Sequence, residues 1–296
     1  MERYKGIIPE WDLFREAMQR PLPTVIRANT LRIPPEGLRR RLEGKGFRLE
    51  LLPWDGTAFK VEGEVPVGNT VEHWLGYYYV QEATQTLPVL ALDPQPGERV
   101  LDLCAAPGGK ATQIAQLMGD QGLVVANDPS PKRLRALLAN LYRLGVRCAV
   151  VTQCPGEGFP GEGTFDRVLV DAPCSAEGTA RRHPPLRRGA PLGVIRRMAS
   201  LQKKILSHAL KLVRPGGIVV YSTCTIAPEE NEAVVKYVLE QGLAELLPWE
   251  PPVPHSPGLT SFAGQEYGPE LKKAVRFYPH HFDSEGGFVA VLRRSR

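Results

Sequence analysis

The chain lacks the sequence signatures of several protein classes. No apolar stretch approaches the roughly 18 residues of a membrane-spanning helix, so we expect no association with a membrane. The five cysteines form no Cys-x-x-Cys pair, and the adjacent His280 and His281 lack a partner motif, so we expect no metal site. An odd number of cysteines without an opening signal-peptide pattern argues against a secreted disulfide framework and favours the reducing cytoplasm.

Composition and charge are those of a globular protein. Of the 296 residues, 43% are hydrophobic and 23% are charged, which suits one large domain or two smaller ones. The 37 Lys and Arg residues exceed the 32 Asp and Glu residues, and the net charge of +5 is compatible with binding to a polyanion without requiring it. We find no internal repeat and no low-complexity tail, and we expect a monomer.

From residue 77 onward, short apolar runs alternate with segments of helical periodicity. This alternation predicts strand-helix-strand units and a doubly wound, mostly parallel sheet. The segment 247–268 is rich in Pro and Gly and is expected to be a long loop, followed by two strands that form an antiparallel hairpin at the sheet edge. The expected strands are 99–104, 123–127, 148–152, 165–170, 218–222, 274–278 and 288–293; the expected helices are 82–92, 110–118, 131–144, 192–213 and 228–241.

The part before this alternation mixes helical and strand signals on a smaller scale. Helices are expected at 11–20 and 36–45, and strands at 24–29 and 47–52. We therefore divide the chain into a small α/β region, residues 1–73, and a larger domain, residues 74–296.

Residues 102–110 form a nucleotide-type loop after the first strand of the large domain. The run Asp102-Leu-Cys-Ala-Ala-Pro-Gly-Gly-Lys110 passes directly into a helix, where glycines let the backbone approach a ligand and free N–H groups are available. The loop is neither Gly-x-Gly-x-x-Gly nor a Walker sequence, so it favours neither dinucleotide nor triphosphate binding.

Two polar residues at the next strand ends are further candidates. Asp128 is placed to accept hydrogen bonds from a ribose diol, although it could merely cap the helix that begins at Pro131. Gln153 could meet an adenine edge through its amide, or it could be a solvated loop residue.

Two thiols follow two apolar runs, Cys174 in Val168-Leu-Val-Asp-Ala-Pro-Cys-Ser175 and Cys224 in Ile218-Val-Val-Tyr-Ser-Thr-Cys-Thr225. Both runs predict buried parallel strands, so both thiols are expected at carboxyl ends of strands, where α/β sheets bind ligands. If these strands are neighbours, the thiols face one cleft, and such a pair suggests chemistry on a pyrimidine ring. Cys104 and Cys148 are more readily explained as small buried residues.

These motifs together identify a family resemblance. In order and spacing, residues 102–110, 171–175 and 222–225 resemble the signature motifs of the S-adenosylmethionine-dependent RNA cytosine-C5 methyltransferases of the RsmB/RsmF and Sun-domain type. Residues 28–31, 181–182 and 276–288 resemble their accessory motifs. The resemblance covers the chain from about Thr24 and implies a Rossmann-like methyltransferase sheet with an antiparallel edge strand and a small N-terminal RNA-binding region.

The resemblance also implies roles for individual residues. Cys224 would attack cytosine C6, Cys174 would help to resolve the adduct, and Asp171 would hydrogen-bond the cytosine edge, for which it needs a raised pKa to act as a donor. Lys110 would assist thiolate formation or ring positioning. The S-adenosylmethionine site would comprise Cys104, Ala105, Ala106, Pro107, Gly108, Gly109, Lys110, Asp128, Arg133, Gln153 and Asp171.

The expected substrate is tRNA or rRNA, held in part by Arg181 and Arg182 beyond the catalytic turn. The chain departs from the family pattern at Gln153, where an acid is common, and at residues 285–288. A thiol after Asp171-Ala-Pro, where amine methyltransferases carry an aromatic residue, favours carbon as the target. Two alternatives stay open: a DNA enzyme with Cys174 as nucleophile, against which residues 222–225 argue, and a noncatalytic RNA-binding or ribosome-assembly factor.

Overall fold

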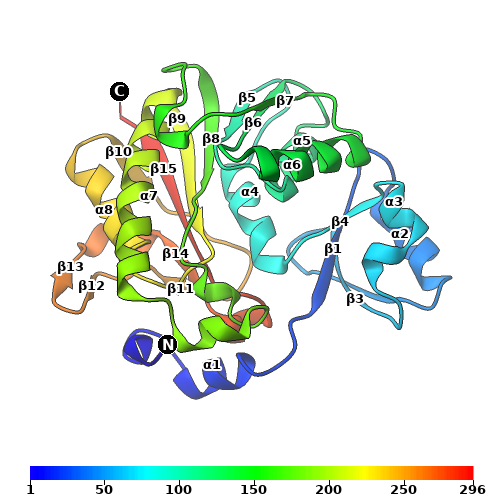
Figure 1. Ribbon diagram of the computed structural model, residues 1–296, viewed down its shortest axis with the longest axis horizontal. Helices are drawn as coiled ribbons and strands as arrows, with labels where there is room; N and C mark the ends of the chain where they lie inside the picture. Colours follow the sequence, from blue (N-terminus) through cyan, green and yellow to red (C-terminus); the bar gives the residue numbers. More distant parts are fainter. Residues whose placement is uncertain (296) are drawn as a thin grey trace.

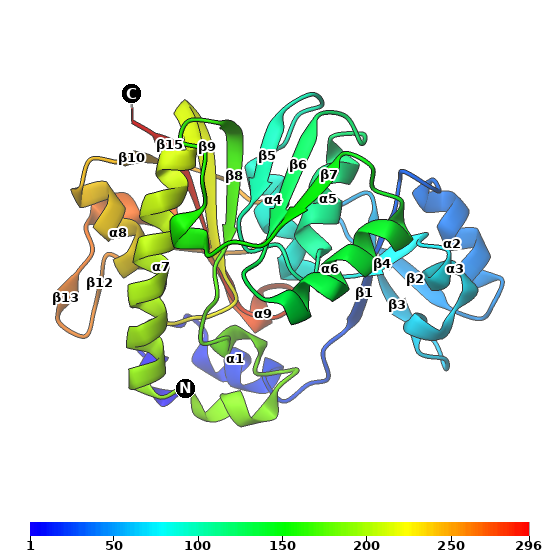
Figure 2. The same ribbon diagram turned by 45° about the horizontal axis from the view of Figure 1, so that its top comes forward.

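A sheet of nine strands forms the centre of the computed structural model, which describes residues 1–295 (Figure 1). Five parallel strands are neighbours in the order β7-β6-β5-β8-β9 and lie side by side in Figure 2. This confirms the predicted doubly wound, mostly parallel sheet. The bounds are β5 Arg99–Asp102, β6 Leu123–Asn127, β7 Ala149–Thr152, β8 Phe165–Asp171 and β9 Val213–Thr223.

Helices cover both faces of this sheet. On β8, Val168 and Val170 belong to an apolar cluster shared with α7 and α8, whereas Leu169, between them, belongs to a second cluster shared with α4 and α5. All three side chains are fully buried, which explains why the strand is continuously apolar rather than alternating. The helices are α4 Leu87–Leu92, α5 Gly109–Leu117, α6 Pro131–Leu144, α7 Leu192–Leu212 and α8 Glu232–Glu240.

The ends of α6 show why the sequence predicted this helix closely. The Ser130 hydroxyl accepts from the backbone N–H of Arg133, Pro131 occupies the first turn, and Gly145 ends the helix at a φ of 74°. The predicted helix 82–92 is instead a 3-10 turn, Ala83–Thr86, followed by α4. Pro88 has no N–H to donate and therefore fits the first turn of α4 rather than a helix interior.

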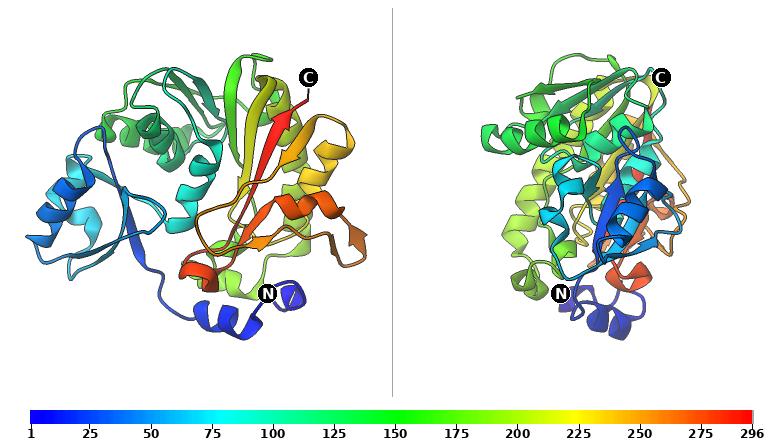
Figure 3. Two further views of the ribbon diagram at one scale, coloured as in Figure 1. Left: turned by 180° about the vertical axis from the view of Figure 1, so that it is seen from behind. Right: turned by 90° about the vertical axis from the view of Figure 1, so that its right-hand side faces the viewer.

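The last strands extend the sheet beyond β9. The predicted antiparallel pair is present as β14 Val275–Phe277 and β15 Gly287–Arg294, but β15 is not at the edge. It pairs with β9 on one side and with β14 on the other, as the view from behind shows (Figure 3). Residues 289–292 are all buried, so an edge position would have exposed apolar surface. Short strands β10 Ala244–Leu247 and β11 Ser256–Pro257 complete the sheet.

A separate four-stranded sheet forms an N-terminal lobe at the right of Figure 1. Its antiparallel order is β2-β3-β1-β4, with β1 Thr24–Ala28, β2 Arg48–Leu51, β3 Ala58–Glu62 and β4 Tyr78–Val80, and α2 Pro35–Glu43 packs on it. Because β4 pairs with β1, this sheet extends past the division at residues 73 and 74 that the sequence suggested.

The first 20 residues pack away from that lobe. Tyr4 and Phe14 share an apolar cluster with Ile195 and Tyr278 of the large domain. Helix α1 Trp11–Ala17 lies near α9 Pro279–Phe282 at the bottom of Figure 1. The chain therefore contacts the large domain first and enters the lobe only at β1.

The remaining elements are short. The segment 247–268, predicted as a loop, contains β11 and the hairpin of β12 Ser261–Phe262 with β13 Gln265–Glu266. Helix α3 is Val71–Trp74, and the remaining 3-10 turns are Glu2–Tyr4, Val67–Asn69, Gly156–Gly158, Glu177–Thr179, Pro184–Arg188 and Pro269–Lys273. Within residues 1–295, none of the helices combines the length and apolar character that crossing a membrane requires.

Candidate active site

The two thiols that follow β8 and β9 lie against each other. These strands are parallel neighbours in which Asp171 stands opposite Ser222, so the two segments beyond them leave the sheet side by side. The Sγ atoms of Cys174 and Cys224 are 3.3 Å apart. Both thiols can therefore reach one small ring.

The environment distinguishes the two thiols. The hydrogen bond with Cys224, burial, and the charges of Cys224 and Glu230 raise the pKa of Cys174 well above its usual range. Cys174 consequently keeps its proton at neutral pH and can donate it to a Cys224 thiolate. A protonated Cys174 is a poor nucleophile, because the thiolate is the reactive form of cysteine.

Asp171 and Lys110 form an ion pair beside the thiols. Lys110 Nζ lies 2.8 Å from Asp171 Oδ2, and it also donates to the side-chain oxygen of Gln85. The Ser222 hydroxyl donates to the other oxygen of Asp171 at 3.0 Å. Burial disfavours the charge of Lys110, but the charge of Asp171 and their hydrogen bond outweigh it and raise the pKa of Lys110. Asp171 is thus held as an acceptor, whereas the family resemblance implied a donor.

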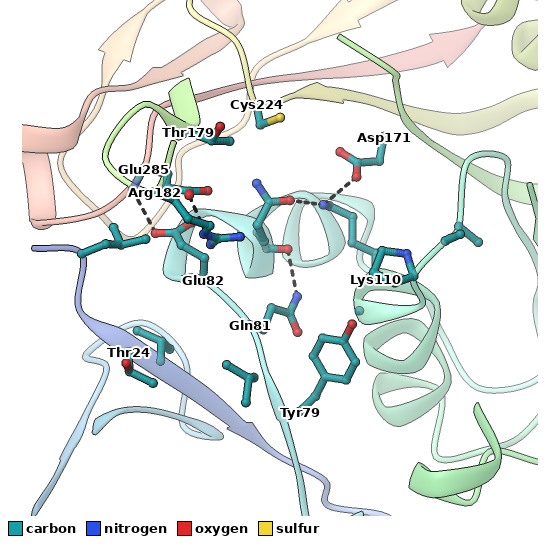
Figure 4. A pocket seen from close by; sticks show the side chains of 18 of the residues that line it. Thr24, Tyr79, Gln81, Glu82, Lys110, Asp171, Thr179, Arg182, Cys224 and Glu285 are labelled. Carbon is teal, nitrogen blue, oxygen red and sulfur yellow. Dashed lines mark hydrogen bonds and ion pairs between the residues drawn. The ribbon is translucent and has the colours of Figure 1, made fainter. Parts of the chain in front are cut away.

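A cavity of about 530 Å³ opens beside these groups. Figure 4 shows Cys224 and Asp171 at the top of the cavity, Lys110 at the right, Glu82, Arg182 and Glu285 at the left, and Tyr79 from the N-terminal lobe at the bottom. The site therefore lies between the large domain and the lobe, at the carboxyl ends of the parallel strands, where α/β folds bind their ligands.

The loop after β5 forms one wall of the cavity. Its residues 104–107, with Gly109 and Lys110, line the space, and Gly108 precedes α5 with a φ of 111°. A Cβ at Gly108 would lie 3.0 Å from Leu137 Cδ1, so a larger residue would push the loop from α6. Burial raises the pKa of Cys104, which keeps this thiol protonated, although Cys104 is partly exposed to the cavity and is not a purely buried side chain.

The carboxyl group of Asp102, at the end of β5, has no hydrogen-bond partner among residues 1–295. Asp102 lines the cavity and is fully buried. Burial, with a contribution from the charge of Asp171, raises the pKa of Asp102 to about 7. A ligand that offers a donor or a positive charge would satisfy it.

Asp128, Arg133 and Gln153 lie outside the cavity lining. Asp128 Oδ1 accepts from the backbone N–H of Ser130 at 2.9 Å, and Asp128 Oδ2 lies 2.9 Å from Arg133 Nη1. Asp128 therefore closes a turn onto the N-cap residue Ser130 but does not itself cap α6, which the Ser130 hydroxyl does. Arg133 also donates to the carbonyl of Ala106 and so connects α6 to the loop. Gln153 is exposed just after β7.

The two arginines expected to bind RNA differ. Arg181 is enclosed: its guanidinium donates to the carbonyls of Pro21 and Ser284 and to Asp283, at 2.6 to 3.0 Å. Its side chain is fully buried, so Arg181 ties the amino-terminal segment to the loop before β15 and is not available to a phosphate. Arg182 is about half exposed, lines the cavity and pairs with Glu285 at 3.1 Å.

Several buried polar residues around the site gave no recognisable sequence signal. Glu82 accepts from the backbone N–H of Glu285, and both side chains line the cavity. Glu177 and Glu230 lie buried beneath the thiol segments. Their only sequence signal is a charge, Glu177 in a loop and Glu230 within the predicted helix 228–241, and a charge normally indicates solvent exposure. Among residues 1–295, no group of three His, Cys, Asp or Glu side chains is arranged to hold a metal ion.

Comparison with protein families decides the classification. Residues 89–293 match the family described as 16S rRNA methyltransferase RsmB/F, and residues 1–83 match the N-terminal domain of 16S rRNA methyltransferase RsmF. The chain belongs to the RsmB/F methyltransferase family. The resemblance inferred from the motifs is thereby confirmed, and the chain is a methyltransferase of the RNA cytosine-C5 type.

Individual relatives are named for the same activity, methylation of cytosine C5 in RNA. The chain is 39% identical, over its full length and 96% of the relative, to the tRNA (cytosine(49)-C(5))-methyltransferase of Pyrococcus abyssi. It is 40% identical to the human 28S rRNA (cytosine(4447)-C(5))-methyltransferase, over 95% of this chain and 35% of that protein. It therefore spans nearly all of the archaeal relative but only about a third of the human one.

Solved structures share the fold. A methyltransferase homologue from Pyrococcus horikoshii matches 99% of this chain and 93% of its own, with a TM-score of 0.87 and 38% identity. NSun6 from Pyrococcus horikoshii, solved with SFG, matches 100% of this chain and 97% of its own, with a TM-score of 0.84 and 25% identity.

Proposed function

We propose that this RsmB/F family member is an S-adenosylmethionine-dependent RNA cytosine-C5 methyltransferase that acts through a covalent bond between Cys224 and C6. The observation that carries the proposal is the pair of thiols 3.3 Å apart beside the ion pair of Asp171 and Lys110. Cytosine C5 is a weak nucleophile, and addition of a thiolate at C6 turns it into an enamine-type carbon that can attack a methyl donor.

The residues divide the steps as follows. The Cys224 thiolate adds to C6, and the electrons of the C5–C6 double bond move into the ring toward N3. Asp171 accepts from the exocyclic amine, and the Lys110 ammonium meets the negative charge that develops on the ring. C5 then takes the methyl group, the C5 proton is removed, and the C6–S bond breaks to release Cys224 as a thiolate.

Cys174 supports the last step. Once Cys224 is bonded to carbon, Cys174 loses both the hydrogen bond and the neighbouring charge that keep its pKa high. It can then release its proton to solvent, accept the C5 proton and allow elimination of Cys224. The adduct itself would thus make the second thiol competent for its own removal.

The cavity suits S-adenosylmethionine. When bound, this cosubstrate supplies an electrophilic methyl group on a sulfonium. The unpartnered carboxyl group of Asp102 can accept from its ammonium group, and the close backbone approach at residues 104–110 leaves room for its amino-acid end. Contacts of Asp128 with the ribose and of Gln153 with the adenine would require the ligand to extend beyond the residues that line this cavity. A relative solved with SFG, an S-adenosylmethionine analogue, supports this assignment.

The RNA would enter between the lobe and the large domain, where Arg182 can exchange its pairing with Glu285 for a phosphate. We assign RNA recognition to the N-terminal lobe because its residue Tyr79 reaches the cavity. Relatives named for tRNA and for rRNA support an RNA substrate of either class.

The test uses the purified full chain with methyl-labelled S-adenosylmethionine and total RNA. We expect label in 5-methylcytosine, and label confined to adenine would refute the proposal. The mechanism is tested on denaturing gels: Cys174→Ala should accumulate a covalent RNA adduct, whereas Cys224→Ala should form none. Cys148→Ala, a cysteine at the far end of the sheet, serves as the matched control and should behave as wild type. The opposite pattern would exchange the two thiol roles.

A further inference from the structure

Three consecutive residues at the start of α8 are buried and polar, although none was recognised in the sequence. Glu230, Asn231 and Glu232 have 0% relative exposure. The sequence predicted a continuous helix over 228–241, but α8 begins only at Glu232, and Asn231 has a non-helical conformation with φ −110° and ψ −94°. Glu230 and Asn231 therefore lie in a turn before α8, with their side chains directed into the protein.

Glu230 holds the segment that carries Cys174. Its Oε2 accepts from the backbone N–H of Ser175 at 2.9 Å and from Gln202 Nε2 at 2.9 Å. The same Gln202 amide, from the middle of α7, donates to the carbonyl of Pro173 at 2.8 Å. The backbone is thus fixed on both sides of Cys174, and neither contact involves the two residues that flank Cys224.

Asn231 holds the other segment. Its Oδ1 accepts from the Thr223 hydroxyl at 2.6 Å, and its Nδ2 donates to the carbonyl of Thr225 at 3.1 Å. These are the residues immediately before and after Cys224. The two segments also meet directly, where the Ser175 and Thr225 hydroxyls lie 2.8 Å apart and where the two thiols lie 3.3 Å apart.

We propose that Glu230 and Gln202 position Cys174, and that Asn231 separately positions Cys224. Together these three residues set the 3.3 Å approach of the two thiols. If the proposed function holds, Glu230 governs adduct resolution and Asn231 governs adduct formation; this consequence rests on the proposed function. The chemistry supports such a division because a displacement of about 1 Å costs a reaction step about a hundredfold.

The test measures thiol reactivity one cysteine at a time. Other titratable groups surround the pair, namely Asp171, Glu177, Tyr221 and Lys110, and none of them is changed. Alkylation of Cys174 by iodoacetamide is followed by peptide mass spectrometry from pH 6 to 9 in a Cys224→Ala background, and alkylation of Cys224 in a Cys174→Ala background. This readout needs neither RNA nor cosubstrate.

We expect Glu230→Gln and Gln202→Leu each to raise alkylation of Cys174 about tenfold at neutral pH. The first removes the negative charge that favours the protonated thiol, and the second removes the hydrogen bonds that hold the Cys174 segment. Both should leave Cys224 within about twofold of its parent. Asn231→Ala should change Cys224 and spare Cys174. The matched control is Glu229→Gln, a neighbouring glutamate that pairs with Arg3 at the surface and should alter neither thiol.

Equal changes at both thiols, or at neither, would overturn the proposal. If Asn231→Ala does not fold, the Glu230→Gln and Gln202→Leu pair still decides the Cys174 half. In otherwise wild-type protein, Glu230→Gln should prolong the RNA adduct and Asn231→Ala should reduce its formation. Selective alkylation without any adduct in the wild type would retain the positioning roles and reject the proposed function, so the two failures are distinguishable.

Discussion

Gly178 offers the sharpest test of how closely the position of Cys224 is constrained. The backbone N–H of Gly178 donates to the carbonyl of Cys224 at 2.9 Å, and its own carbonyl accepts from Gly286 at 3.0 Å. A Cβ at this position would lie 2.4 Å from the Gly286 oxygen and 2.7 Å from the Cys224 oxygen. Both obstacles are backbone atoms, which cannot rotate away as a side-chain end would.

The size of the effect of Gly178→Ala follows from these distances. Ordinary contact begins near 3.4 Å, so the Cys224 carbonyl must move by about 0.7 Å and carry its thiol with it. Misplacement by about 1 Å can cost about a hundredfold in rate, so we expect kcat to fall about 30- to 100-fold. Overpacking costs about 1–3 kcal/mol of stability, which lowers Tm by several degrees in a chain of this size.

Single-turnover methylation and thermal unfolding measure the two effects. The matched control is Gly158→Ala, in another three-residue 3-10 turn, where a Cβ meets nothing within 4 Å. It should retain wild-type rate and stability. A Gly178→Ala enzyme with an unchanged Tm and a rate within about threefold of wild type would refute the reasoning, since the Cys224 carbonyl would then have room to move.

Two further predictions concern other parts of the molecule. At Gly76, with φ 70°, an alanine Cβ would lie 1.8 Å from the Arg143 carbonyl oxygen, so Gly76→Ala should separate the lobe from α6 and increase proteolysis at the junction. Burial and the charge of Glu82 raise the pKa of Glu285 to about 8 despite its pairing with Arg182. Its stabilising contribution is therefore present below about pH 4.5 and lost as pH rises through 8, so Glu285→Gln should raise Tm at pH 9 and not at pH 4. A constant Tm difference across that range would contradict the assignment.

The sequence predicted the parallel sheet and the motif-bearing loops well because their signals are local. A run such as residues 218–222 is apolar in nearly every position, and the caps of α6 are readable from Ser130, Pro131 and Gly145. Strands β3 and β4 were not predicted. Each is short, and β4 gains its pairing with β1 only after some 50 residues of chain have intervened.

The sequence prediction was wrong where a charged side chain is buried rather than exposed. An arginine next to a catalytic motif is a reasonable candidate for binding phosphate. The guanidinium of Arg181 is instead occupied by Pro21, Asp283 and Ser284, which come from the two ends of the chain. The prediction that the final hairpin lies at the sheet edge was wrong for a related reason. The order of strands depends on which strands pair with β15 on each side, and these strands are remote in sequence.

The sequence by itself determined the family, the chemistry and the two thiols, because motif spacing and strand patterns are properties of contiguous residues. Only the tertiary structure decided how close the thiols lie and what surrounds them. Their 3.3 Å approach depends on the pairing of β8 with β9. The raised pKa of Cys174 depends on its contact with Cys224, on burial and on Glu230, which lies 56 positions beyond it. Distance and dielectric environment arise only when remote segments meet, and no local pattern encodes them.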